Sequence, residues 1–393
     1  MMRTVLTASW LSNGTGISEH PAIVIEDGRI ESIGSQSAEA AASGADQVLD
    51  FPEATLAPAF FDVHIHGAAG HDVMEATPEA LASVGRLLAA HGTGSYLATT
   101  VTAPEDATLR SLSGLAKLIA RPPARSQDGP VTWPIGIHLE GPFLSHAKRG
   151  VHPPALLVEP DIALFDRFYD AGEGHVRLMT LAPELPGAAE LAAHATSRGV
   201  RVSVGHSNAT AAETRKVIAA GAVSATHTFN AMRALDHREP GILGVVLTTD
   251  SLFAEIICDG IHTTPEMVKI WWRCKGAERG ILITDGMSAT GMPDGDYQLG
   301  GFTVQVANGR ASMGDVLAGS VLTLDRALAN FIAFTGGSVE EGLGLLTTNP
   351  AAMTGLGGQT GSLEVGRPAN LVVVDASGKL LASFVNGRQA ASN

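Results

Sequence analysis

The fold is indicated first by one short stretch, Phe60–Gly67, which reads Phe-Phe-Asp-Val-His-Ile-His-Gly. Its apolar residues predict a buried strand, and polar residues gather where that strand ends. His64 and His66 are two residues apart, so both imidazole rings face the same side of the strand. Two imidazoles on one face favour a metal site. The alternative is a pair of polar residues on a surface strand.

Seven further apolar runs follow along the chain, and helix-like segments separate most of them. The eight predicted strands are Phe60–His66, Ser95–Val101, Pro134–Glu140, Val176–Leu181, Val200–Gly205, Ala222–Thr226, Phe253–Cys258 and Gly280–Thr284. The predicted helices include Pro78–Ala90, Pro104–Ile119, Ala188–Ser197, Ala211–Ala220 and Pro265–Cys274. Eight strand–helix units in sequence predict an α/β fold, the (β/α)8 TIM barrel.

Both ends of the chain have a different, β-rich pattern. Near the N-terminus, Ala22–Glu26 and Arg29–Ile33 flank the turn Asp27-Gly28, which is a hairpin signal. Near the C-terminus, Asn370–Asp375 and Lys379–Asn386 indicate another hairpin. We therefore predict a small β-sandwich domain built from residues 1–55 and 360–393, beside a barrel of residues 56–359.

The segment after the eighth predicted strand departs from the strand–helix alternation. Asp296–Ala311 predicts a β excursion. Further helices are expected near Val321–Phe334, Val339–Leu346 and Pro350–Leu356.

The composition suits a compact protein with a large core. The chain has 393 residues, of which 45% are hydrophobic and 17% charged, and a barrel of this kind takes about 250 residues. A net charge of −14 argues against nucleic-acid binding, which needs a basic surface. Two cysteines, Cys258 and Cys274, are too few for a disulfide framework. With no signal-peptide pattern and no long apolar run, we expect a cytoplasmic protein that does not bind membranes.

Polar residues end several of the predicted strands, and in a barrel these ends surround one pocket. Glu140 ends the third strand, and His206 and His227 follow the fifth and sixth. Each histidine alone would more often be structural, but together they occupy equivalent positions in the barrel. We expect Glu140, His206 and His227 to hold one divalent metal ion, with a water in the open position.

Other polar residues extend this predicted centre. His64 and His66 are candidates for a second metal site, so one or two ions per subunit are expected, with zinc favoured over Fe2+ or another divalent ion. Asp285, after the eighth strand, is placed to be the catalytic general base, because a carboxylate near a cation stays ionised. His138, one layer deeper than Glu140, is a core histidine, a partner of a ligand or a ligand itself.

An acidic protein needs a local cluster of cations if it binds an anion. The segment Ser145–His152 follows Glu140 and is basic; a solvated loop is the alternative interpretation. Further cations suited to a phosphate are available at Arg233, His237, Arg238 and His262.

Several of these runs resemble the N-acetylglucosamine-6-phosphate deacetylases of the amidohydrolase superfamily, and the resemblance covers nearly the whole chain. The matching runs are Asp62–Gly67, His138–Phe143, Gly205–Asn208, Thr226–Met232, Asp259–His262, Thr284–Met287 and Leu317–Ser320. The more specific ones read His-Leu-Glu-Gly-Pro-Phe and His-Thr-Phe-Asn-Ala-Met.

The resemblance implies a role for each matching residue. Glu140, His206 and His227 match the family's metal ligands, and Asp285 matches its catalytic acid/base. Substrate contacts are implied for Val151, His152, Asn230, Ala231, Arg238, His262, Leu317, Ala318 and Gly319. Among these, His152 corresponds to the acetamide contact, while Arg238 and His262 correspond to phosphate contacts that come partly from the neighbouring subunit of a homodimer.

Two features bear on the number of metal ions. Family members that lack the paired histidines bind one metal, and here both His64 and His66 are present, which favours two. The fourth strand, Leu178–Leu181, carries no lysine, unlike superfamily relatives with a carbamylated lysine bridge. Glu140 is expected to take the bridging role.

The implied reaction is hydrolysis of the acetamide of N-acetyl-D-glucosamine 6-phosphate, by metal-activated water, to D-glucosamine 6-phosphate and acetate. One alternative is another substrate, either N-acetylgalactosamine 6-phosphate or a cyclic amide. A second alternative is a non-catalytic sugar-phosphate sensor on the same barrel. A sensor has no need for Asp285 beside a metal, which favours an enzyme.

Overall fold

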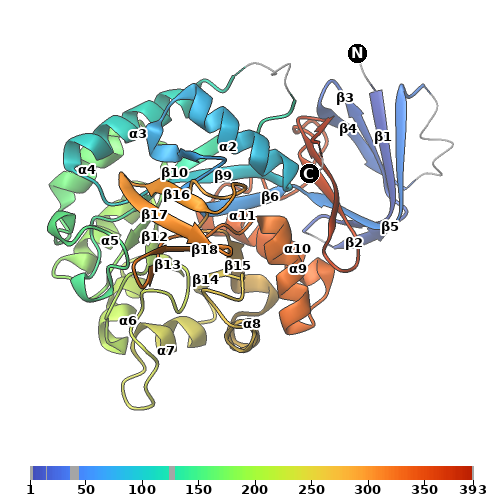
Figure 1. Cartoon of the computed structure of the whole chain (residues 1–393). Coiled ribbons are helices and arrows are strands. Elements are labelled where there is room, and N and C mark those ends of the chain that lie inside the picture. The colour runs from blue at the N-terminus through green and yellow to red at the C-terminus, as the bar shows by residue number, and fades with distance from the viewer. Residues whose placement is uncertain (1–2, 15, 36–43, 124–128, 392–393) are drawn as a thin grey trace.

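The computed structural model describes residues 3–14, 16–35, 44–123 and 129–391. The chain forms a barrel with a separate β-sheet beside it (Figure 1). The predicted α/β barrel fold, with a small β domain built from both ends of the chain, is confirmed.

The barrel contains eight parallel strands in chain order. They are β6 (Phe60–Ile65), β9 (Thr93–Thr100), β10 (Pro134–Glu140), β11 (Val176–Leu181), β12 (Arg201–Val204), β13 (Ala222–Ala225), β14 (Phe253–Ile257) and β15 (Gly280–Ile283). Each lies within about two residues of a strand predicted from the sequence. All eight are almost entirely buried, which explains why they read as apolar runs without alternation.

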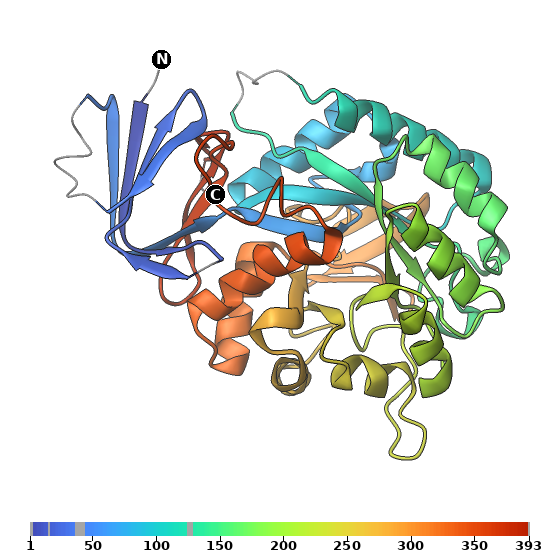
Figure 2. The same ribbon diagram turned by 180° about the vertical axis from the view of Figure 1, so that it is seen from behind.

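Helices cover the outside of the barrel (Figures 1 and 2). They are α2 (Pro78–Ala90), α3 (Glu105–Ala120), α4 (Ile162–Ala171), α5 (Ala188–Ser197), α6 (Ala211–Ala219), α7 (Gly241–Thr248), α8 (Pro265–Arg279), α9 (Leu324–Thr335), α10 (Val339–Leu346) and α11 (Thr348–Thr354). Short 3-10 turns are η1 (Val73–Glu75), η2 (His146–Lys148) and η3 (Pro154–Leu156).

Local sequence explains where several helices begin. The Thr77 hydroxyl accepts a hydrogen bond from the Ala80 amide, and Pro78 occupies the first turn of α2. Helix α6 begins with a capping box, in which Thr210 and Glu213 satisfy each other's free amides. These caps fix the starts of the two helices directly after the loops that precede them.

Contacts between the first and last strands close the barrel. The Asp285 amide donates to the His64 carbonyl at 2.9 Å, and the His66 amide donates to the Gly286 carbonyl at 2.8 Å. Deeper inside, the Thr284 hydroxyl donates to the buried Asp62 carboxylate at 2.6 Å. The closure therefore places Asp285 directly beside the two histidines of β6.

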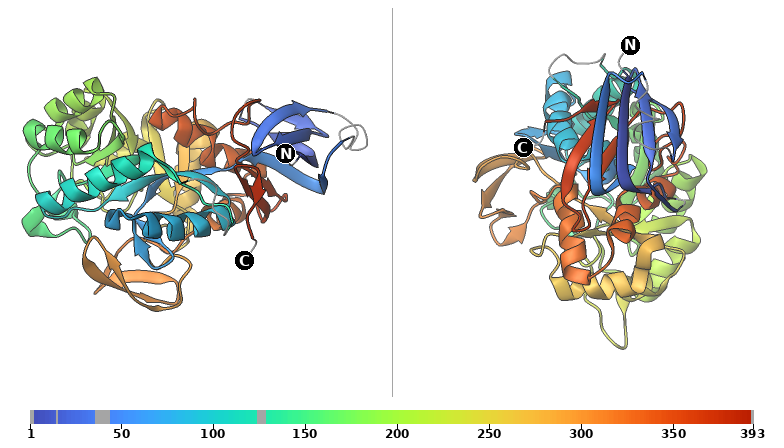
Figure 3. Two further views of the ribbon diagram at one scale, coloured as in Figure 1. Left: turned by 90° about the horizontal axis from the view of Figure 1, so that it is seen from above. Right: turned by 90° about the vertical axis from the view of Figure 1, so that its right-hand side faces the viewer.

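A four-stranded antiparallel sheet, the flap, covers one side of the barrel mouth (Figures 1 and 3). Its strands are β16 (Gly295–Leu299), β17 (Phe302–Ala307), β18 (Arg310–Met313) and β19 (Val316–Leu317). The predicted β excursion is confirmed and runs six residues further than expected. Asp72 anchors the flap by accepting a hydrogen bond from the Gly300 amide at 2.7 Å. Asp72 is the last residue of β8 (His71–Asp72), which pairs with β7 (Gly67–Ala68) in a two-stranded ribbon.

The second large sheet joins the two ends of the chain. Its strands are β1 (Arg3–Ser12), β2 (Ile17–Glu19), β3 (Ala22–Glu26), β4 (Arg29–Gly34), β5 (Gln47–Pro58), β20 (Leu371–Val374), β21 (Leu380–Val385) and β22 (Arg388–Gln389). Asp27 and Gly28 have positive φ angles of 50° and 83°, as a tight turn between β3 and β4 requires. Strand β5 pairs with both β1 and β20, so the two ends of the chain share one sheet. The domain bounds expected from the sequence, residues 1–55 with 360–393 and residues 56–359, stay a prediction.

None of the helices in the described part of the chain is both long enough and apolar enough to cross a membrane.

The Asn349 side chain ties α11 to the start of β15, because its amide donates to the carbonyls of Ala277 and Gly280 at 2.7 and 2.8 Å. Asn349→Ala leaves both carbonyls without this donor. We expect the free energy of unfolding to fall by about 1–3 kcal/mol, measured as a lower midpoint of thermal or denaturant unfolding. Gln359→Ala, at an exposed site nearby, should change stability by less than about 0.5 kcal/mol. Equal midpoints for the two variants would contradict this role.

Candidate metal centre and active site

A cavity of about 470 Å³ opens at the carboxyl ends of the barrel strands. Catalytic groups of such barrels lie at this end, because the loops that follow the strands surround one pocket. Glu140, His66, His206, His227 and Asp285 all line the cavity. The structure thus brings together five of the residues that the sequence placed at strand ends.

Three side chains form the first group, which we call the first subsite: Glu140, His206 and His227. The Nε2 atoms of the two histidines lie 3.0 Å apart, and each lies 3.3 Å from Oε1 of Glu140. A tetrahedral ion with bonds of about 2.0–2.1 Å holds its ligand atoms about 3.3–3.4 Å apart. The spacing of these three atoms therefore fits a small divalent cation.

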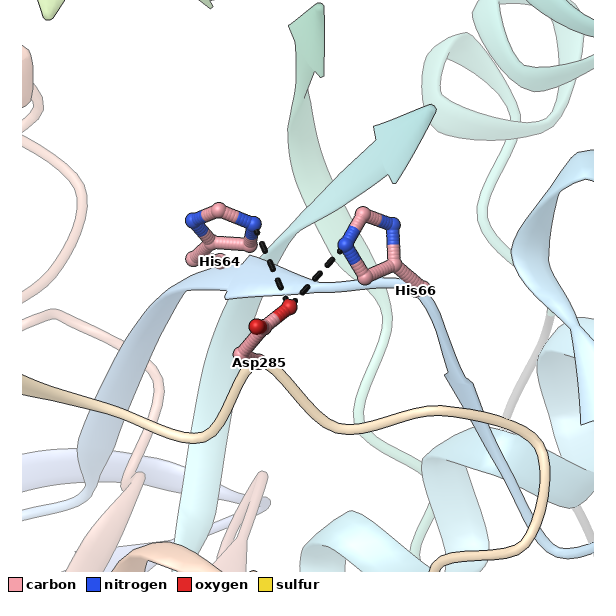
Figure 4. A group of neighbouring side chains, drawn as sticks. All are labelled: His64, His66 and Asp285. Atoms are coloured by element: carbon pink, nitrogen blue, oxygen red, sulfur yellow. Dashed lines mark ion pairs between the residues drawn. The ribbon is translucent and has the colours of Figure 1, made fainter. Parts of the chain in front are cut away.

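His64, His66 and Asp285 form the second group, the second subsite (Figure 4). Asp285 Oδ1 lies 3.4 Å from His64 Nε2 and 3.1 Å from His66 Nε2. Glu140 faces this group too, with Oε1 3.4 Å from His64 Nε2 and Oε2 3.3 Å from His66 Nε2. The Glu140 carboxylate thus lies between the two subsites, as a bridging ligand must.

Hydrogen bonds behind the ligands decide which ring nitrogen faces the site. The Nδ1 atom of His206 lies 2.9 Å from the Lys148 carbonyl, and that of His66 lies 3.1 Å from the Thr99 carbonyl. A carbonyl only accepts, so each Nδ1 carries a proton, and each Nε2 faces the site, where it can hold a second proton or offer a lone pair to a cation. Lone pairs that face one another at close range fit a cation between them.

The charges of the buried side chains also favour a cation at this site. Burial raises the pKa of Glu140, but the charge of His64 and hydrogen bonds from the other histidines hold it well below its usual value. Burial lowers the pKa of His66, yet hydrogen bonds to Asp285 and Glu140 raise it to about 9. The buried carboxylates therefore attract positive charge, which protons or metal ions can supply.

Three of these residues have strained backbones. His206, His227 and Asp285 have φ angles of 45°, 28° and 50°, in a region that residues with a side chain rarely adopt. Each follows the last residue of its barrel strand by two positions. The strain turns the side chain inward at the strand end, and the surrounding hydrogen bonds hold it there.

His138 lies in the layer below the ligands. Its Nε2 atom lies 2.8 Å from the Thr180 hydroxyl, and its ring meets the His64 ring edge-on at 4.6 Å. Burial lowers the pKa of His138, so the ring is neutral. Of the roles left open by the sequence, the structure supports a core histidine that packs under a ligand.

Most of the expected substrate contacts line the same cavity: Val151, His152, Asn230, Ala231, His262, Leu317 and Gly319. Ala318 is buried just behind the wall. The basic side chains of His146, Lys148 and Arg149 also line the cavity, so the basic segment faces it.

Arg238 does not line the cavity within one chain. It is exposed, in the loop that connects β13 to α7 and projects from the molecule (Figures 1 and 2). Its expected phosphate contact therefore depends on a second copy of the chain and stays a prediction. His262, in contrast, points into the cavity, and Asp259 holds its Nδ1 at 2.6 Å.

The sequence interpretation missed Glu255. This residue is fully buried in β14, with Oε2 3.3 Å from His64 Nδ1. The available signal was a carboxylate within the apolar run Phe253–Cys258, which is costly unless a partner compensates it.

Comparison with known proteins identifies the family of this metal centre. Residues 55–391 match the model of the amidohydrolase family. The chain belongs to the amidohydrolase family. This membership agrees with a barrel whose strand ends carry two groups of side chains placed to hold metal ions.

Close relatives within the amidohydrolases are sugar-phosphate deacetylases. The chain is 39% identical to N-acetylgalactosamine-6-phosphate deacetylase of Escherichia coli O157:H7, over 85% of this chain and 87% of that protein. It is 36% identical to N-acetylglucosamine-6-phosphate deacetylase of Lysinibacillus sphaericus, over 92% and 91%. Among solved structures, a variant of the N-acetyl-D-glucosamine-6-phosphate deacetylase of Mycobacterium smegmatis, in complex with N-acetyl-D-glucosamine-6-phosphate, superposes with a TM-score of 0.91 at 35% identity and covers both chains completely.

Cation affinity should rise between pH 6 and pH 9, because protons held by His66, whose pKa is raised to about 9, must leave before a cation binds. We expect roughly tenfold tighter binding per pH unit for each displaced proton, measured by competition with a chromophoric chelator. His66→Asn should reduce this slope, whereas His71→Asn, at an exposed histidine, should keep it. An affinity that is constant across this range would contradict the prediction.

Proposed function

We propose that this amidohydrolase removes the acetyl group from N-acetyl-D-glucosamine 6-phosphate by hydrolysis, which yields D-glucosamine 6-phosphate and acetate. The observation that carries the proposal is the convergence of Glu140, His206 and His227, with Asp285 beside them, on the floor of one cavity. The named activities of the relatives at 33–39% identity support the same reaction.

The metal-binding residues are assigned from this geometry. Glu140, His206 and His227 would hold the first divalent ion, and His64 and His66 would contribute to a second. Nitrogen-rich ligands at tetrahedral spacing favour zinc over Fe2+ or another divalent ion. When bound, such an ion lowers the pKa of a water molecule and polarises the acetamide carbonyl.

Asp285 is the proton carrier. Burial raises its pKa, but the charges of His64 and His66 hold that pKa well below the usual value, so the carboxylate is ionised at neutral pH. It accepts the proton of the attacking water as the new carbon–oxygen bond forms. It then donates this proton to the amine nitrogen as the carbon–nitrogen bond breaks.

His152 is suited to stabilise the negative charge on the carbonyl oxygen. Its Nδ1 lies 2.8 Å from the Thr102 hydroxyl and accepts a hydrogen bond from the Thr102 amide at 3.4 Å. A hydroxyl can donate or accept but an amide only donates, so we assign Nδ1 as the acceptor and place the proton on Nε2. Burial lowers the pKa of His152, so the ring is a neutral donor. Its Nε2 lies 3.5 Å from Glu140, next to the first subsite, where the acetamide oxygen would form its charge.

The phosphate end of the substrate belongs at the rim, away from the carboxylates. His262 lines the cavity there, together with Asn230 and the backbone at Leu317 and Gly319. We propose a homodimer in which Arg238 of one copy reaches the cavity of the other, because its loop projects outward. We also propose that the enzyme acts in the cytoplasm on this small substrate.

One alternative substrate has specific support. The relative at 39% identity is named for the galactosamine epimer, whereas most of the curated relatives are named for the glucosamine epimer. The ratio of kcat/KM for the two epimeric sugar phosphates separates these substrates. No described residue favours a cyclic amide, and a sensor without turnover has no use for Asp285 at this position.

Asp285→Asn should lower kcat for acetate release by about 10²- to 10⁴-fold, because the amide cannot accept the proton of the attacking water. The first subsite does not include Asp285, so at least one ion per chain should remain, as measured by elemental analysis of the metal-loaded variant. Near-normal turnover would remove Asp285 from this role. Release of acetate from neither epimer by the metal-loaded natural chain would end the proposal itself.

Arg238→Ala should raise KM for the phosphorylated sugar by about 10- to 100-fold, as expected for a lost charge-assisted hydrogen bond, with a smaller change in kcat. The unphosphorylated N-acetyl sugar should be used equally well by both proteins. Leu235→Ala, at an exposed, uncharged neighbour on the same loop, is the matched control and should keep KM. An unchanged KM in Arg238→Ala would refute the phosphate contact.

A further inference from the structure

Glu255 lies beneath both subsites, and the mechanism above gives it no part. It lies in the middle of β14 with no exposed surface. A carboxylate in this position is costly unless hydrogen bonds or a positive charge compensate it. Its Oε1 atom makes no hydrogen bond within the described part of the chain, so hydrogen bonding alone does not meet this cost.

A single oxygen of Glu255 contacts one ligand from each subsite. Oε2 lies 3.3 Å from Nδ1 of His64 in the second subsite, and 3.4 Å from the backbone nitrogen of His227 in the first. His227 has a φ of 28°, so its amide is held in a strained conformation. Glu255 is therefore placed to orient a side chain in one subsite and the backbone in the other.

The contact with Glu255 determines how His64 faces the cavity. A carboxylate accepts, so Nδ1 of His64 carries a proton and Nε2 is the nitrogen left to face the cavity. That Nε2 lies 3.4 Å from oxygens of both Glu140 and Asp285 and makes no hydrogen bond within the described residues. A bare lone pair there would be repelled by the two carboxylate oxygens, and either a second proton or a metal cation among the three atoms relieves this repulsion.

His64 differs in this respect from the other histidine ligands with a partner behind them. His66 and His206 donate to neutral backbone carbonyls, whereas His64 faces an anion. A carboxylate behind a histidine raises the basicity of its other nitrogen more than a carbonyl does. The charge of Glu255 therefore acts mainly on the second subsite.

We propose that Glu255 is a positioning residue for the cation of the second subsite. It selects the His64 tautomer that binds through Nε2, and it adds negative charge beneath that cation. The proposal rests on the proposed function only in taking the centre to hold divalent metal ions. It is independent of the identity of the sugar.

Two substitutions separate charge from hydrogen bonding. Glu255→Gln keeps an oxygen that can accept from both His64 and His227 but removes the charge. Glu255→Leu removes both. Ser224→Ala is the matched control, because Ser224 is buried in the neighbouring strand β13 and its hydroxyl makes no hydrogen bond within the described residues.

The experiment titrates the full chain, after treatment with a chelator, with Co2+ and then with Zn2+. Elemental analysis gives the stoichiometry, and the visible spectrum of Co2+ reports its ligands. We expect two ions per natural chain. In Glu255→Gln, the second ion should bind about 10- to 100-fold more weakly. The affinity for the first ion should not change. The visible spectrum of Co2+ in the second subsite should differ from that of the natural chain. Glu255→Leu should bind the second ion still more weakly, and Ser224→Ala should bind both as the natural chain does.

Wild-type affinity for both ions in Glu255→Gln and Glu255→Leu would overturn the proposal, even if their melting temperatures fell, since Glu255 would then be only structural. A natural chain that binds one ion would overturn it as well. A natural chain that binds two ions but releases no acetate from either sugar phosphate would refute the proposed function and leave the role of Glu255 standing. The two failures are therefore distinguishable.

Discussion

The rest of the centre depends on the contacts of the buried Glu140 carboxylate. Its two oxygens lie 3.3–3.5 Å from five imidazole rings, those of His64, His66, His152, His206 and His227. One anion cannot satisfy five rings through protons alone, because neighbouring protonated rings would repel one another. Two divalent ions would divide four of these rings, all except His152, between the two subsites, with Glu140 between them. Removal of Glu140 would thus affect both subsites, whereas each of these four histidines belongs to a single subsite.

Barrel closure is what makes this convergence possible. The ligands come from β6, β10 and the residues after β12, β13 and β15, which are far apart in the chain. Hydrogen bonds between the backbones of His64 and Asp285, and of His66 and Gly286, join the first strand end to the last. Positive φ angles at His206, His227 and Asp285 then turn the side chains inward. The strain at these positions is offset by the large apolar core between barrel and helices.

The sequence predicts the strands and ligands well for one physical reason: parallel strands buried on both faces are apolar throughout, so a polar residue at their end stands out. The prediction is weaker where apolar and polar residues do not alternate in a recognisable pattern. Helix α7 is apolar on nearly every side, so its sequence lacks the 3.6-residue periodicity of apolar residues that marks a surface helix. Glu255 lies within a strand instead of at its end, and its partner His64 is distant in sequence. Arg238 lies outside the cavity of its own chain, so the substrate contact proposed for it would need a second chain, which no pattern within one chain encodes.

Charge is distributed in layers through the cavity, and this explains how an acidic protein can accept an anionic substrate. Glu140, Asp285 and Glu255 lie at or below the floor, while Lys148, Arg149 and His262 lie at the rim. A phosphate is repelled by the floor and attracted by the rim, whereas a neutral acetamide is not repelled by either. Metal ions on the floor would weaken this contrast if they exceeded the negative charge there. If two divalent ions were bound, the carboxylates of Glu140, Asp285 and Glu255 would leave only a small excess of positive charge. The charge of Glu255 would thereby help to keep the phosphate at the rim and leave the acetamide as the end of the sugar that reaches Asp285.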